Sequence, residues 1–160
     1  MKVIVFTGDA GNACVMTPVY PPDLTPEQEA AFLAERQQRD IPALPDGTPR
    51  QSFVKDSESS EVKAMGHLFD AWRIDSAGQI RVDRSAAEDL KRNQFRALRK
   101  PLLEELDVKF MRAMEDGDTA TINEVRAAKQ VLRDVTLIDL TQYATPQTLS
   151  AFVPKVLNQD

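Results

Sequence analysis

The side chains that most often carry out catalysis are sparse and isolated in this sequence. His67 is the only histidine and Cys14 the only cysteine, so a metal site would depend on carboxylates alone. No G-x-S-x-G nucleophile motif occurs, and the turn at 7–12, TGDAGN, lacks the lysine and spacing of a phosphate-binding loop. Glu104 and Glu105 are adjacent, so on a helix they point apart. We therefore predict a protein that is not an enzyme and has no catalytic, cofactor or metal site.

Basic side chains are concentrated between residues 81 and 100, within a chain whose net charge is −5. They are Arg81, Arg84, Lys91, Arg92, Arg96, Arg99 and Lys100. Such a patch can contact nucleic acid, but Phe95 is its only aromatic residue, and Asp83, Glu88 and Asp89 dilute its charge. The acidic surface of a partner protein, or acids of the same chain, is the favoured counterpart, and nucleic acid is disfavoured.

Composition bounds the class of protein. A chain of 160 residues with 42% hydrophobic residues forms one domain or two small ones. No apolar run approaches the ~20 residues of a membrane span, and the start of the chain is more typical of a strand than of a signal peptide. A lone cysteine excludes a disulfide within the chain. We expect a cytoplasmic protein without a membrane partner.

The first half of the chain predicts a small β-containing domain over 1–83. Segments 3–6 and 13–19, separated by a glycine-rich turn, predict a β-hairpin. Thr25, Pro26 and Gln28 form a capping box for a helix that ends near Arg39. Segments 51–56, 70–75 and 79–83 predict further strands, the last two joined by a turn at 76–78, while 56–61 is predicted to be an exposed polar loop. The side chains expected on the buried side of the paired strands are Trp72, Ile74, Ile80 and Val82.

The second half, 84–160, has helical periodicity and predicts a helical hairpin. Ser85 and Glu88 form a capping box for a long helix, within which Pro101 should cause a kink or break. Gly117 should end that helix. A second capping box, Thr121 and Glu124, starts the returning helix, whose expected apolar face is Ile122, Val125, Ala128, Leu132 and Val135, with Val131 also packing inward. Thr145 and Pro146 begin a last short helix that ends near Pro154. The fold class is therefore α+β, with a β-rich front and a helical end.

Several motifs of this half resemble a bacteriophage family. They are the basic helix start at 92–99, the Leu106–Asp107 pair, the hairpin, the KQVLRD stretch at 129–134 and the TP-x-x-L segment at 145–154. With this arrangement the chain resembles tailed-bacteriophage tail-region proteins, in particular those of the tail or tail-fibre assembly chaperone family. The resemblance implies a non-enzymatic protein without cofactors that is present in the host cytoplasm during assembly. If the protein is a structural component, it would also be present in the virion tail.

The hairpin is predicted to act through surface contact with a tail, tail-fibre or other virion protein. The residues expected to bind the partner are Phe95, Leu98, Leu102, Leu106, Phe110 and Met114, with Arg92, Arg96 and Arg99 setting the orientation. The residues expected to have structural roles are Pro101, Gly117, Leu132, Arg133 and Asp134. Two alternatives stay open: a self-associating subunit of the collar or head–tail region, forming a homo-oligomer through the long helix, and a nucleic-acid-binding accessory protein.

Overall fold

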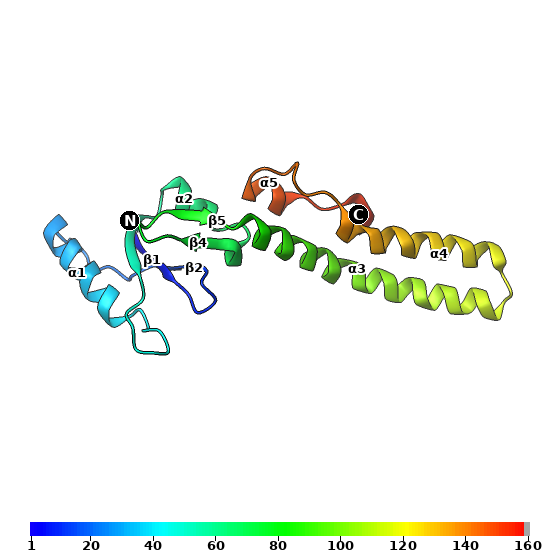
Figure 1. Cartoon of the computed structure of the whole chain (residues 1–160), viewed down its shortest axis with the longest axis horizontal. Coiled ribbons are helices and arrows are strands. Elements are labelled where there is room, and N and C mark those ends of the chain that lie inside the picture. Colours follow the sequence, from blue (N-terminus) through cyan, green and yellow to red (C-terminus); the bar gives the residue numbers. More distant parts are fainter. Residues whose placement is uncertain (159–160) are drawn as a thin grey trace. The chain divides into compact units, whose positions relative to one another are not determined.

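The computed structural model describes residues 1–158 and divides into two compact units, Met1–Ala87 and a second that begins at Glu88. The first contains two β-sheets and the second is helical (Figure 1). The α+β fold class expected from the sequence, with a small β-rich front followed by a helical hairpin and a short terminal helix, is confirmed. Within residues 1–158, no helix is both long enough and apolar enough to cross a bilayer.

The first unit is organised around strand β1 (Lys2–Thr7). β1 pairs with β2 (Ala13–Met16) on one edge and with β3 (Ser52–Asp56) on the other, so the antiparallel sheet has the order β2-β1-β3. Both the first hairpin and the third strand were predicted. Gly11, at φ 74° in the hairpin turn, adopts the left-handed conformation that glycine tolerates best.

Alternation along β1 sends side chains to two different packing layers. On one face Ile4 packs with Leu33 of α1 (Pro26–Arg39), whose predicted Thr25–Gln28 capping box is present. On the other face Val3 and Val5 pack against the second sheet. The central strand is therefore covered on both sides.

The second sheet is the short hairpin of β4 (Trp72–Ile74) and β5 (Ile80–Val82). Trp72 and Ile80 are buried, and Ile74 and Val82 pack around them as partly buried neighbours, which confirms the shared apolar side. The indole Nε1 of Trp72 donates to the carbonyl of His67 at 2.7 Å, which satisfies the polar atom of this buried ring.

The segment predicted to be an exposed loop leads directly into a short helix, α2 (Ser60–Ala64). The hydroxyl of Ser59 accepts a hydrogen bond from the backbone N–H of Val62 at 3.4 Å and so caps α2. A 3₁₀ turn, η1 (Phe69–Ala71), then leads into β4. The loop prediction is wrong from Ser60 onward, because five residues are too few to show helical periodicity.

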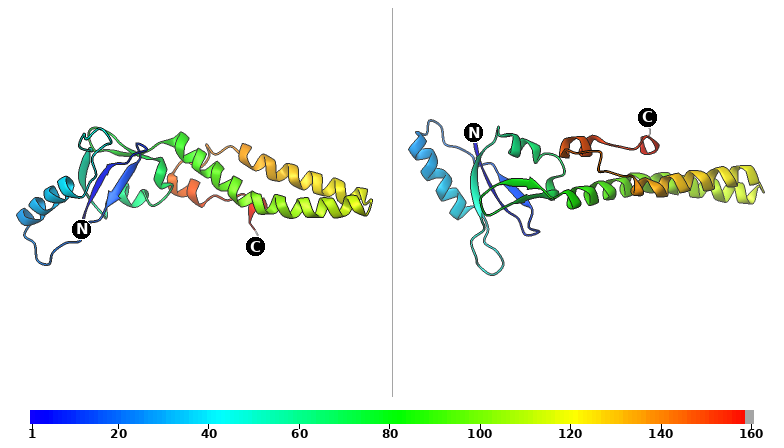
Figure 2. Two further views of the ribbon diagram at one scale, coloured as in Figure 1. Left: turned by 90° about the horizontal axis from the view of Figure 1, so that it is seen from below. Right: turned by 45° about the horizontal axis from the view of Figure 1, so that its top comes forward.

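The helical part of the chain contains α3 (Arg84–Glu115) and α4 (Thr119–Asp134), followed by η2 (Val135–Leu137), α5 (Pro146–Ala151) and η3 (Lys155–Leu157). Figure 1 and the left view of Figure 2 show α3 and α4 side by side and antiparallel. α5 has the predicted Thr145 cap with Pro146 at its first turn. The helical hairpin predicted for residues 86–135 is confirmed.

Both long helices begin earlier than predicted. Asp83 Oδ1 accepts from the backbone N–H of Ala86 at 3.1 Å, and Asp118 Oδ1 accepts from that of Thr121 at 3.0 Å. Aspartate is among the strongest N-cap residues, so an aspartate two or three residues upstream takes the place of each predicted cap, Ser85 or Thr121. The capping predictions at these two positions are wrong.

The turn between α3 and α4 is a Schellman motif centred on Gly117. This glycine has φ 70°, the left-handed conformation predicted for it. Its N–H donates to Met114 O at 3.3 Å, and the N–H of Asp118 donates to Ala113 O at 2.9 Å. The next residue after Gly117 is thus already the cap of α4, which makes the reversal very tight.

Pro101 does not break α3, which continues as one helix from Arg84 to Glu115. A proline removes the hydrogen bond to the carbonyl four residues earlier, here that of Ala97. Both Ala97 and Pro101 are exposed, so water can reach the released carbonyl. The predicted break is wrong for that reason.

Candidate protein-contact surface

The facing sides of α3 and α4 are joined by apolar and polar contacts along their length. Ile122, Val125 and Leu132 of α4 are buried, as predicted from their spacing. Lys129 Nζ donates to Asp107 Oδ1 at 2.6 Å and lies 4.7 Å from the centroid of the Phe110 ring. The ion pair places Asp107 and Lys129 at the same height along the two helices.

Arg99 connects α3 to the last turn of α4. Its Nη1 donates to Arg133 O at 3.0 Å and, more weakly, to Leu132 O at 3.4 Å. The final carbonyls of a helix lack intrahelical partners and carry the negative end of its dipole. Arg99, predicted to orient a partner, is therefore engaged in closing the hairpin.

An aromatic cluster of one buried and two partly buried rings lies in the helical unit. The Phe95 ring, 1% exposed, meets Phe152 edge to face at a centroid distance of 6.0 Å, and Phe152 stacks on Tyr143 at 4.1 Å. Lys91 is also buried, and its ammonium donates to Ser150 O at 2.7 Å. Burial lowers the pKa of Lys91. These contacts attach α5 to α3, and they leave Phe95 in the core rather than at the surface.

An apolar groove of about 440 Å³ lies between α3 and α4. It is lined by Leu102, Glu105, Leu106, Lys109, Ala128, Val131, Leu132 and Val156. Leu102 and Leu106 on α3 belong to the predicted partner-binding set, and they are only partly buried. Val131 is 53% exposed, so the expectation that it packs inward is wrong. The groove surface is therefore contributed by both helices.

Two charged side chains interrupt this otherwise apolar lining. Glu105 and Lys109 are four residues apart on α3, and both are exposed. The structure of residues 1–158 shows neither an ion pair nor a hydrogen bond for either side chain. An acid and a base that make no close ion pair within the described residues thus lie along the α3 side of the groove, and the charge of Lys109 acts at longer range on Asp118.

The remaining predicted contact residues are dispersed. Leu98 and Met114 are 43% and 52% exposed and lie outside the groove lining, and Phe110 is half-buried beneath Lys129. Arg92 pairs with Glu88 at 3.2 Å, whereas Arg96 donates to Asn93 Oδ1 at 2.5 Å. The structure therefore brings together only Leu102 and Leu106 of the set.

The groove residues on α4 carried a signal in the sequence. Ala128 and Val131 are three residues apart, and together with Leu132 they form an apolar surface wider than one facing helix can cover. Val156 could not be found in this way, because its position depends on the path of the chain after α4. For Glu105 the sequence indicates only that its side chain points away from that of Glu104 on a helix.

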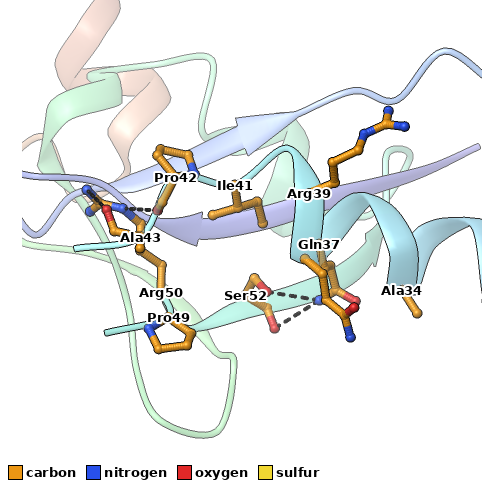
Figure 3. A pocket seen from close by; sticks show the side chains of 10 residues that line it. Ala34, Gln37, Arg39, Ile41, Pro42, Ala43, Pro49, Arg50 and Ser52 are labelled. Atoms are coloured by element: carbon orange, nitrogen blue, oxygen red, sulfur yellow. Dashed lines mark hydrogen bonds between the residues drawn. The ribbon is translucent and has the colours of Figure 1, made fainter. Parts of the chain in front are cut away.

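A second cavity, of about 630 Å³, lies within the first unit (Figure 3). Its polar side chains are turned toward their own chain. Gln37 Nε2 donates to Ser52 Oγ at 3.0 Å, and Arg50 donates to Pro42 O at 2.8 Å and Thr7 O at 3.0 Å while contacting the Asp9 carboxylate. These bonds hold the proline-rich segment against the sheet, and we assign this cavity a structural role.

The described residues contain no group of three or more His, Cys, Asp or Glu side chains placed to hold a metal ion. Burial raises the pKa of the Cys14 thiol, and the nearby Arg50 only partly opposes that effect. A raised pKa disfavours the thiolate that nucleophilic chemistry requires. The candidate site is therefore the groove, whose composition suits contact with another apolar surface.

The basic segment 81–100 is largely engaged within the chain. Lys91 is buried, Arg92 is ion-paired and Arg99 caps α4. Arg81, Arg96 and Lys100 are exposed, so fewer than half of the seven basic side chains are freely placed for the phosphate contacts that dominate nucleic-acid affinity. Comparison with protein-family models, curated proteins and solved structures finds no match to this chain.

Proposed function

We propose that the chain is a non-enzymatic protein of a tailed bacteriophage that works through protein–protein contact. It acts in the host cytoplasm during construction of the tail or tail fibre, as a component of the virion or as an assembly factor. The phage context rests on the resemblance of segments 92–99, 129–134 and 145–154 to tail-region proteins. The contact mechanism rests on one observation, the apolar groove between α3 and α4.

The groove supports a contact function because its apolar lining remains open in the isolated chain. Val131 and Val156 are 53% and 40% exposed, and both lie in the lining with Leu102 and Leu106. Covering such a surface is favourable by about 25 cal/mol per Å² of apolar area removed from water. Apolar grooves between paired helices are a recurring docking surface for protein segments.

The experiment compares phage carrying the wild-type gene with phage carrying Val131→Glu. Purified virions are analysed by mass spectrometry, and infectious particles are counted. A virion component should be found in wild-type particles and lost from the variant. An assembly factor should be absent from particles, but Val131→Glu should reduce the yield of tailed particles.

Met111→Glu is the matched control. Met111 is 59% exposed, close to the value for Val131, and lies outside the groove lining. The same charge is introduced on a helix of the same hairpin, so Met111→Glu should leave incorporation and yield unchanged. The phage function would be refuted if the protein were absent from virions and deletion of its gene left the yield of tailed particles unchanged.

A further inference from the structure

We infer that the groove binds a second copy of this chain, so that two hairpins stack groove to groove in antiparallel directions as a four-helix bundle. The inference rests on the part of the proposed function that makes the groove a protein-contact surface. The inference adds the identity of the partner. It is argued from the charged side chains that line the groove and from the alignment of α3 with α4.

The charges along the groove are self-complementary. Glu105 and Lys109 are separated by about 6 Å along the helix, at 1.5 Å per residue. Neither makes a close ion pair or a hydrogen bond within residues 1–158, although the charge of Lys109 helps to lower the pKa of Asp118. In an interface with two-fold symmetry, residue i contacts residue j of the partner and j contacts i. A two-fold axis that crosses α3 near Asp107 places Glu105 opposite Lys109 of the partner subunit, and Lys109 opposite the partner subunit's Glu105.

The same axis brings apolar side chains of α4 together. Asp107 and Lys129 are joined at 2.6 Å, so an axis at the height of Asp107 crosses α4 near Lys129. Ala128 and Val131 are the lining residues closest to that point, one on each side. Each would lie near its own copy, and the exposed side chain of Val131 would be covered.

The path of the chain after α4 favours the antiparallel direction. Val156 of η3 lines the groove, and η3 packs against α4. If the two hairpins ran in the same direction, the two copies of η3 would meet at the same end of the interface. In the antiparallel arrangement each η3, which lines the groove beside Leu102 and Leu106, faces the part of the other subunit's α3 that lies between Asp107 and the turn at Gly117.

A second copy fits better than an unrelated partner because the two charges suffice for each other. A different protein would have to supply both a base for Glu105 and an acid for Lys109, whereas a copy already carries both at the required spacing. Exposed pairs of this kind contribute modestly and are screened by salt. They set register and direction, and the apolar lining drives association.

The test is analytical ultracentrifugation of the full chain over a range of micromolar concentrations. We expect a monomer–dimer equilibrium for the wild type. Glu105→Lys places two bases opposite each other, and Lys109→Glu places two acids opposite each other, so each should weaken the dimer about tenfold. The double variant Glu105→Lys/Lys109→Glu restores opposite charges and should dimerise nearly as well as the wild type.

Glu104→Lys is the matched control. It introduces the same charge one residue away, outside the groove lining, and creates a lysine pair at i, i+4 with Lys100 just as Glu105→Lys does with Lys109. Glu104→Lys also removes the 4.0 Å ion pair between Lys100 and Glu104, so the control should lose at least as much helix stability as Glu105→Lys, and circular dichroism checks that each variant is folded. Glu104→Lys should leave the dimer intact.

Several outcomes would overturn the inference. A wild type that stays monomeric at every concentration does so, as does a double variant whose dimer is weaker than that of either single variant. A monomer whose Val131→Glu variant still reduces tail yield would mean that the groove binds another protein, which preserves the proposed function. If the charge variants change dimerisation as predicted but the protein has no effect on the yield of tailed particles, the inference stands and the phage function is refuted.

Discussion

Arg99 Nη1 on α3 donates a hydrogen bond of 3.0 Å to the backbone carbonyl of Arg133 in the last turn of α4. The same carbonyl also accepts a hydrogen bond from the Thr136 hydroxyl at 3.3 Å, and the guanidinium places a positive charge at the negative end of the helix dipole. The bond from Arg99 joins residues that are 34 positions apart in the chain. It holds the open end of the hairpin, at the opposite end from Gly117.

Replacing Arg99 with methionine should lower the free energy of unfolding of the helical unit by about 1 kcal/mol, because a helix-end hydrogen bond and a favourable dipole interaction are lost. Urea denaturation followed by circular dichroism measures the change. Arg96→Met is the control, since the hydrogen bond that Arg96 makes within the described residues goes to Asn93, one turn away on the same helix, and the change should alter stability by less than about 0.5 kcal/mol. Equal effects would show that the bond to α4 contributes nothing specific.

Burial of Lys91 predicts a pH dependence of stability. Its pKa in the native state lies below the ordinary value of 10.5 because burial disfavours the charged form. Between the native pKa and the unfolded pKa, the unfolded chain binds a proton that the native chain has released. The free energy of unfolding contributed by this group therefore rises with pH through that window and levels off above 10.5.

The measurement for Lys91 is urea denaturation of the wild type and of Lys91→Met at several pH values from about 8 to 10.5. Other titrating groups are common to both proteins, so the difference between the two curves isolates Lys91. Wild-type stability should gain on the variant as pH rises. Two curves that stay parallel would show that Lys91 does not lose its proton more easily in the folded chain.

Gly117→Ala should destabilise the helical unit by about 1 kcal/mol, because φ 70° is strained for an L-residue. A Cβ at this position would meet no atom within 4 Å, so the cost comes from the backbone alone. Gly117→Asn should therefore recover part of the loss, since asparagine tolerates this conformation better. An asparagine variant less stable than the alanine variant would contradict this explanation.

Gly78→Ala should destabilise the first unit by two effects. The backbone at Gly78 has φ 77°, and an added Cβ would lie 2.6 Å from the Phe53 ring. Trp72 is the only tryptophan and begins β4, the strand that precedes the turn at Gly78. Its fluorescence therefore follows unfolding of this unit. In the Phe53→Leu background the same substitution should cost less, because the smaller side chain removes part of the clash. An unchanged cost would attribute the whole effect to the backbone.

Features encoded by neighbouring residues could be predicted from the sequence. The β1–β2 hairpin, the Thr25 cap and the turn at Gly117 each depend on residues within one turn of each other. The caps at Asp83 and Asp118 could not be chosen in the same way, because each competes with a well-formed capping box two or three residues later. Which of two nearby residues becomes the N-cap depends on contacts with other parts of the chain, and the local sequence pattern does not contain those contacts.

The groove shows the same limit at the level of side chains. A period of three to four residues placed Leu102 and Leu106 on an apolar stripe, but it could not separate them from Phe95, which α5 covers. Likewise Val131 and Leu132 are adjacent and chemically similar, yet one is exposed and the other buried. Which apolar residues stay accessible depends on the faces that α3 and α4 turn toward each other and on where the chain after α4 packs, and the second of these is not encoded in the local pattern.

The buried guanidinium of Arg50 has a consequence for proteolysis. Trypsin cleaves after an arginine whose side chain enters its specificity pocket, but the side chain of Arg50 is only 4% exposed and is held by the carbonyls of Thr7 and Pro42. The Arg50–Gln51 bond should therefore resist digestion in the native chain, although a proline-rich connection precedes it. Cleavage at this bond would report that the connection has come away from the sheet.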